Sequence, residues 1–110
     1  MAKKKKAPLI RSYPKTWNVM GVKWKVVFKR NLFGNCISGL CDPATATIYV
    51  KLNQDSDPEI NRQEIFKTFI HEALHAIEYE MGREVPHHFI DMFELGVADM
   101  LLTNNVKGLI

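Results

Sequence analysis

Residues 66–82 read FKTFIHEALHAIEYEMG, and this stretch decides the fold of the 110-residue chain. Its apolar positions recur at intervals of three and four residues, which is typical of a helix that buries one face. These positions are Phe66, Ile70, Ala73, Leu74 and Ile77. Gly82 follows them, and glycine readily adopts the left-handed conformation that ends many helices. The sequence therefore predicts a long amphipathic helix that stops at Gly82.

The start of this helix has two candidates in the sequence. Asp57 before Pro58 fits an N-cap followed by proline at the first helical position, where no backbone N–H is needed. Asn61 with Glu64 fits a second capping pair. The sequence alone leaves both starts open.

Residues 71–75 of this helix read HEALH, which is an H-E-x-x-H pattern. Positions i and i+4 of a helix point the same way, so the imidazoles of His71 and His75 can reach one zinc ion. Glu72 is rotated from His71 by about 100°. It is therefore a poor third ligand and a good general base for a metal-activated water. The alternative is a pair of hydrogen-bonded core histidines.

A catalytic zinc site needs a third protein ligand and an open position for water. The candidates lie in a second predicted helix, from near Pro86 to about Asn104. If this helix runs antiparallel to the first, Glu94 returns to the level of the H-E-x-x-H pattern and points close to the core. We therefore expect Glu94 as the third ligand, with Asp91 and His87 as alternatives. The core stripe predicted for this helix is Phe89, Ile90, Phe93, Val97, Met100 and Leu101.

Three more side chains are candidates for roles near these histidines. Glu78 lies three residues after His75 on the same helix face, where a carboxylate can orient a ligand imidazole through its free N–H. A solvent-exposed acidic position explains Glu78 equally well. Tyr49 and Tyr79 are candidate substrate contacts, although tyrosines at such positions more often serve packing.

The segment from Thr16 to Phe33 has the alternation of a strand, with Gly21 as a turn or bulge between two runs. Trp24 and Val26 alternate with lysines, which predicts a half-buried antiparallel strand with a basic outer face. Residues 45–52 read TATIYVKL and predict another strand. If residues 46–50 form an exposed edge, they can receive an extended peptide as an added strand.

The chain between these two strand regions, residues 31–43, is rich in Gly, Asn, Ser and Pro and is predicted to be a loop. Strands followed by helices predict an α+β fold. We expect a small antiparallel β-meander followed by a helical hairpin that carries the histidines.

Composition places the chain among single-domain globular proteins. Its residues are 46% hydrophobic and 25% charged, and no apolar run is long enough for a membrane span. The basic N-terminus lacks the apolar stretch of a secretory signal, so we expect a cytoplasmic protein. Cys36 and Cys41 cannot form a tetrahedral zinc site by themselves and are expected to be free thiols, with a local disulfide as the minority interpretation.

Charge is distributed very unevenly along the chain. Residues 1–41 contain ten Lys or Arg and no acidic residue, whereas residues 42–110 contain five basic and twelve acidic residues. The run Lys3 to Lys6 repels itself, so we expect residues 1–8 to be a disordered basic tail and residues 9–110 to form one domain. The basic segment also makes nucleic acid a candidate partner, since phosphate contacts need only clustered cations.

With HEALHAIEYE and a downstream Glu94 in place, the chain resembles the HExxH zinc metallopeptidases of the gluzincin type. The order of strands, HEALHAIEYEMG and FIDMFELGVADMLLTNN is similar to small metallopeptidases of tailed phages and prophages, and to the ImmA/IrrE and SprT-like groups. The resemblance covers most of residues 17–105. It implies a minimal zincin-like fold, zinc on His71 and His75, Glu72 as catalytic base, and a helix-borne acidic third ligand. Glu94 fits that ligand after eighteen intervening residues.

The sequence departs from the gluzincin pattern at one position. Gluzincins commonly carry an acidic or amide residue four positions after the ligand Glu, and that position here is Ala98. His87 and Asp91 do have the four-residue spacing. The resemblance therefore leaves the choice of third ligand open.

Two functions from different classes follow from these observations. The first is a zinc-dependent peptidase that hydrolyses peptide bonds through a metal-activated water, and for a phage-encoded protein its place is the host cytoplasm. The second is a nucleic-acid-associated or partner-binding module in which the zinc site is structural or inactive.

Overall fold

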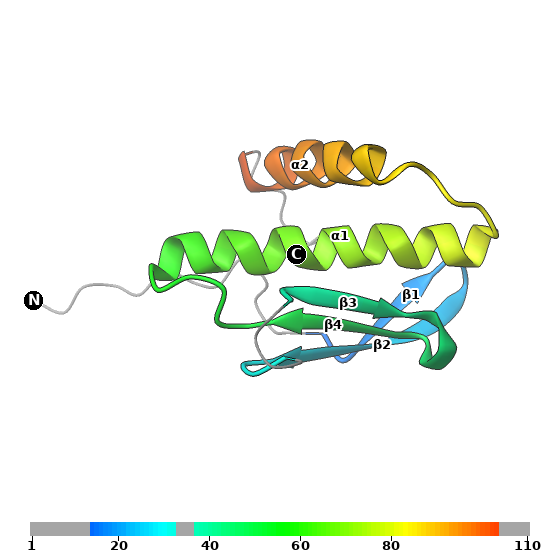
Figure 1. Ribbon diagram of the computed structural model, residues 1–110, viewed down its shortest axis with the longest axis horizontal. Helices are drawn as coiled ribbons and strands as arrows, with labels where there is room; N and C mark the ends of the chain where they lie inside the picture. Colours follow the sequence, from blue (N-terminus) through cyan, green and yellow to red (C-terminus); the bar gives the residue numbers. More distant parts are fainter. Residues whose placement is uncertain (1–13, 33–36, 104–110) are drawn as a thin grey trace, which may run out of the picture.

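The computed structural model describes residues 14–32 and 37–103, with side chains up to residue 100. A four-stranded sheet is covered on one face by helix α1 (Pro58–Met81), and helix α2 (His87–Thr103) lies on the far side of α1 (Figure 1). The predicted α+β class and the helical hairpin are confirmed. Residues 1–8, predicted to be a disordered tail, lie outside the described residues.

Strands β1 (Thr16–Val19) and β2 (Val22–Lys29) form an antiparallel hairpin. Its tight turn consists of Met20 and Gly21, which both have positive φ angles of 50° and 83°. Two positive φ angles are what a two-residue hairpin turn requires, and Gly21 meets that requirement without steric cost. The predicted turn at Gly21 is therefore confirmed.

The second half of the sheet consists of strands β3 (Gly39–Asp42) and β4 (Thr47–Lys51), which are antiparallel to each other. A short 3-10 turn, Pro43–Thr45, connects them. The strand order is β1-β2-β4-β3, so β3 is an edge strand and β4 is internal.

Two details of the predicted sheet are wrong. β4 pairs parallel with β2, so the sheet is mixed and not an antiparallel meander. β3 forms inside residues 31–43, which the composition predicted to be a loop, because pairing with β4 satisfies its backbone groups. As a consequence, the exposed edge expected at residues 46–50 is instead provided by β3.

The core lies between the sheet and α1. Trp24, Ile48 and Val50 are fully buried there, and Phe66 and Phe69 pack against them from the helix. Burial of each such side chain stabilises the fold by about 1.5–3 kcal/mol. The indole N–H of Trp24 donates to Glu80 Oε2 over 2.8 Å, which satisfies the one polar atom of that buried side chain.

Local signals set both ends of α1. The Asp57 carboxylate accepts hydrogen bonds from the backbone N–H groups of Glu59 and Ile60, so Asp57 and not Asn61 is the N-cap. Gly82 ends the helix with a φ of 67°. The predicted stop at Gly82 is confirmed.

Helix α2 contacts α1 with one side only. Ile90 and Ala98 are buried against α1, whereas Phe89, Phe93 and Met100 are 40%, 50% and 58% exposed. The predicted core stripe is wrong for these three residues because no further layer in the described part of the chain covers α2. The Leu101 side chain lies outside that part.

Neither helix is long and apolar enough to cross a membrane, within the part of the chain that was searched. Of the two cysteines, Cys41 is a free thiol and Cys36 is not among the described residues.

Candidate metal centre

His71 and His75 lie one turn apart on the face of α1 that is turned toward α2. Their Nε2 atoms point at each other over 3.2 Å. Two nitrogens that bind one tetrahedral zinc ion at about 2.0–2.1 Å are about 3.3–3.4 Å apart. The pair therefore already has the separation that a shared zinc ion needs.

A carboxylate holds the other ring nitrogen of each histidine. His71 Nδ1 is 2.6 Å from Glu94 Oε1, and His75 Nδ1 is 2.6 Å from Glu78 Oε1. An ionised carboxylate only accepts hydrogen bonds, so each Nδ1–H donates to its carboxylate, and in the neutral form of each ring Nε2 then carries the lone pair that can bind a metal. A cation between the two Nε2 atoms would be bound by both of these lone pairs.

Glu94, the predicted third ligand, lies beside His71 but on the Nδ1 side of its ring. Asp91 is on the same side, with Oδ1 3.6 Å from His71 Nδ1. One ligand atom from each of His71, Asp91 and Glu94 lies within 4.8 Å of the others. The structure thus brings Glu94 to the site, and its role as the third zinc ligand stays a prediction.

His87 completes a second group, in which its ligand atom lies within 4.8 Å of those of His71 and His75. Its ring centroid is 5.1 Å from that of His71 and 5.4 Å from that of His75. His87 Nδ1 also lies 3.5 Å from Asp91 Oδ2. Each of the three histidines therefore has a carboxylate on its Nδ1 side.

With a short interhelical turn, His87 would lie too near the start of α2 to return to the level of His71 and His75, which is why the helical rise favoured Glu94. Residues 83–86, which are neither helix nor strand, instead run back along α1 (Figure 1), and non-helical chain can cover more distance per residue than the rise of about 1.5 Å in a helix. The backbone N–H of Val85 donates to Glu78 Oε2 over 2.7 Å, which fixes this return beside α1.

Glu78 therefore has a defined role at the site, although the sequence left its exposure open. Its pKa is lowered, because the hydrogen bonds from the Val85 N–H and from His75 outweigh the opposing effect of burial. Glu78 is consequently ionised at neutral pH and fixes the orientation of the His75 ring.

Glu72 is the buried acidic residue of the site, with 8% of its surface exposed. Burial raises the pKa of its carboxyl group, and the neighbouring His71 and His75 act in the opposite direction. A carboxylate with a raised pKa is a better proton acceptor near neutral pH, which is the property expected of a general base.

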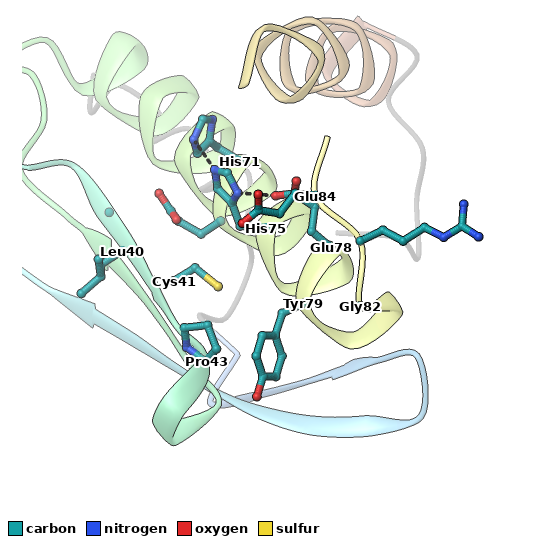
Figure 2. Close-up of a pocket in the computed structure, with 12 residues that line it drawn as sticks. Leu40, Cys41, Pro43, His71, His75, Glu78, Tyr79, Gly82 and Glu84 are labelled. Carbon is teal, nitrogen blue, oxygen red and sulfur yellow. Dashed lines mark hydrogen bonds and ion pairs between the residues drawn. The ribbon is translucent and has the colours of Figure 1, made fainter. Parts of the chain in front are cut away.

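A cavity of about 600 Å³ opens beside the histidines. Figure 2 shows His71, His75 and Glu78 on the α1 side, with Cys41 and Pro43 on the opposite wall. Glu72 also lines this cavity. Burial, followed by the charge of Glu72, raises the pKa of Cys41 to about 12, so its thiol is not ionised at neutral pH. Of the two tyrosines proposed as substrate contacts, Tyr79 lines the cavity, and Tyr49 is not among its lining residues.

Gly39 lets the edge strand approach α1 closely. A Cβ atom at this position would lie 2.5 Å from Thr68 Cγ2, 2.9 Å from the Tyr49 carbonyl oxygen and 3.1 Å from Glu72 Cγ. Sequence reasoning missed both Gly39 and the cavity wall formed by β3, since it interpreted this segment as a loop. The sequence offers only a glycine two residues before Cys41. Without the pairing of β3 with β4, this glycine does not predict a strand or its close approach to α1.

No family model, no curated protein and no solved structure matches this chain.

Proposed function

We propose that the protein is a zinc-dependent peptidase with its metal between the Nε2 atoms of His71 and His75. The observation that carries this proposal is the facing pair of Nε2 atoms at 3.2 Å beside the buried Glu72. The alternative, a pair of hydrogen-bonded core histidines, is compatible with the same 3.2 Å separation, and the carboxylate on each Nδ1 is what favours the metal site.

His87 is the better third ligand in this arrangement. Its ring lies close to both His71 and His75, whereas Glu94 occupies the Nδ1 of His71. A carboxylate bound to the outer nitrogen of a ligand imidazole fixes its orientation and increases its basicity. We therefore assign Glu94 and Glu78 to positioning the zinc ligands, and keep Glu94 as the alternative third ligand.

A zinc ion bound here would polarise a peptide carbonyl and lower the pKa of a bound water. Glu72 lies one residue after His71 and lines the same cavity, so its carboxylate can take a proton from the attacking water. The same carboxyl group can then give that proton to the leaving amine. Its raised pKa favours both transfers near neutral pH.

The edge strand β3 provides a place for an extended peptide. Gly39 and Cys41 of β3 line the cavity that contains His71 and Glu72, and the outer edge of β3 is not paired within the described residues. A peptide that adds to this edge as a further strand would bring a backbone carbonyl close to the histidines. We propose unfolded or extended protein segments as the substrates.

The proposal is tested with zinc-loaded protein and an unfolded substrate such as casein. Glu72→Gln should retain zinc but lose activity by about 10²–10⁴-fold, the usual contribution of a general base. Glu64→Gln on the exposed side of α1 is the matched control and should cleave like the wild type. Equal cleavage by the wild type and Glu72→Gln, or no cleavage by either, would reject the peptidase and favour a module with a structural or inactive metal.

The free thiol of Cys41 is consistent with a reducing compartment, and we propose the cytoplasm. The basic segment for which nucleic acid is a candidate partner, residues 1–41, includes strands β1 and β2, whereas its tail, residues 1–8, lies outside the described residues.

A further inference from the structure

The outer face of the sheet, turned away from α1, carries a cluster of lysines. Trp24 and Val26 of β2 face the core, so the alternate residues Lys23 and Lys25 point outward, as does Lys29 further along. Lys51 of β4 lies directly beside Lys29 in the parallel ladder. These four lysines are called the basic sheet face.

The basic sheet face has little compensating negative charge. None of its four ammonium groups forms an ion pair with a residue that the structure describes. Asp42 of β3 is on the same side of the sheet, two strands away from Lys25, and its carboxylate accepts a hydrogen bond from Thr45. Lys29 and Lys51 are like charges on strands about 4.8 Å apart, which is unfavourable unless an anion lies between them.

Protection of a sheet edge does not explain these lysines. Charged residues that prevent edge-to-edge aggregation are placed on edge strands. Here the edge strands are β1 and β3, whereas the four lysines lie on the central strands β2 and β4. The positions therefore favour a ligand that lies across the face of the sheet.

The spacing of this face suits a phosphodiester backbone with accessible bases. Alternate residues of a strand are about 6.6 Å apart, so the distance from Lys23 to Lys29 is about 20 Å. Between the lysines, Val27, Tyr49 and Leu40 lie side by side in one row across three strands. Lysines that contact phosphates and an aromatic ring that contacts bases are the combination found in single-strand-binding proteins.

We propose that the basic sheet face binds single-stranded nucleic acid, with phosphates on the four lysines and bases over the row centred on Tyr49. The histidines of α1 are on the opposite side of the sheet (Figure 1). Binding therefore requires neither zinc nor peptidase activity, and this proposal stands or falls independently of the proposed function.

Binding is measured by fluorescence anisotropy with the full chain and a labelled oligothymidylate of about 20 nucleotides, long enough to cross the sheet. At about 50 mM salt, Lys25→Gln/Lys29→Gln should weaken binding about tenfold, and the slope of log K against log salt should fall by about 1.4, or 0.7 per lost phosphate contact. The matched control is Arg62→Gln/Lys67→Gln on α1, which removes the same charge and should change affinity less than about twofold. If the first variant does not fold, Lys23→Gln/Lys51→Gln replaces it.

Three results would overturn the proposal. The first is equal binding by the sheet variant and the α1 control. If replacing Lys3 to Lys6 by Gln then abolishes binding, the tail and not the sheet face is the binding site. The second is tighter binding of a duplex of the same length than of the single strand. The third is binding to phosphatidylserine vesicles without binding to the oligonucleotide.

Discussion

Glu94 Oε1 lies 2.6 Å from Nδ1 of His71, although these residues belong to different helices and are 23 positions apart in the sequence. This contact connects α2 to the face of α1 that carries both histidines. It also decides the orientation of the His71 ring, since the Nε2 atom is then directed at His75.

We expect Glu94→Gln to weaken zinc binding by about 10–100-fold, the usual effect of losing a carboxylate that orients a ligand histidine. His87→Ala should weaken binding more, because it removes a ligand. Both affinities are measured by competition with a chromogenic zinc chelator. If Glu94→Gln loses more zinc affinity than His87→Ala, Glu94 is the third zinc ligand and His87 is not.

Metal-free Glu72→Gln should be more stable than the metal-free wild type at neutral pH. Burial raises the pKa of Glu72 above its usual 4.5 in the folded protein, so the folded state binds the proton more tightly than the unfolded state. The contribution of Glu72 is therefore most favourable below pH 4.5 and is lost as the pH rises through its raised pKa. Glutamine stays neutral throughout.

Thermal unfolding at several pH values between about 4 and 8 checks this expectation. The stability difference between Glu72→Gln and the wild type should grow as the pH increases. Identical pH dependence in the two proteins would show that burial does not destabilise the Glu72 carboxylate.

Gly39→Ala should destabilise the protein by about 1–3 kcal/mol, the usual cost of inserting a methyl group into tightly packed surroundings. The methyl group would contact the side chain of Thr68 and the backbone of Tyr49, and β3 would have to move away from α1. Urea unfolding measures the change, and peptidase activity should fall with it because β3 forms a wall of the cavity.

Gly96→Ala is the control for that experiment. A Cβ atom at Gly96 in the middle of α2 meets nothing within 4 Å, and alanine is a better helix former than glycine by about 1 kcal/mol. This variant should be slightly more stable than the wild type. Equal effects at Gly39 and Gly96 would contradict the close approach of β3 to α1.

Features of this fold that depend on neighbouring residues could be predicted from the sequence. Asp57 with Pro58, and Gly82, set the ends of α1 through contacts within one helical turn. The spacing of His71 and His75 placed them on one helix face for the same reason. The alternation of Trp24 and Val26 with lysines likewise predicted which side of β2 is buried.

Features that depend on distant pairing could not be predicted. β3 is a strand only because β4 lies beside it, and its own composition favours a loop. His87 reaches His75 because residues 83–86, which are neither helix nor strand, return beside α1, and no local sequence pattern predicts that path. Phe89 and Phe93 have the hydrophobicity of core residues, but the described part of the chain provides no layer to cover them.

The most direct test of the account is a crystal structure of the zinc-loaded protein with anomalous data at the zinc edge. We predict one zinc ion about 2.0–2.1 Å from the Nε2 atoms of both His71 and His75, with Glu72 outside the ligand shell. An absence of zinc between these two nitrogens would contradict the central claim, and so would zinc bound by Glu72.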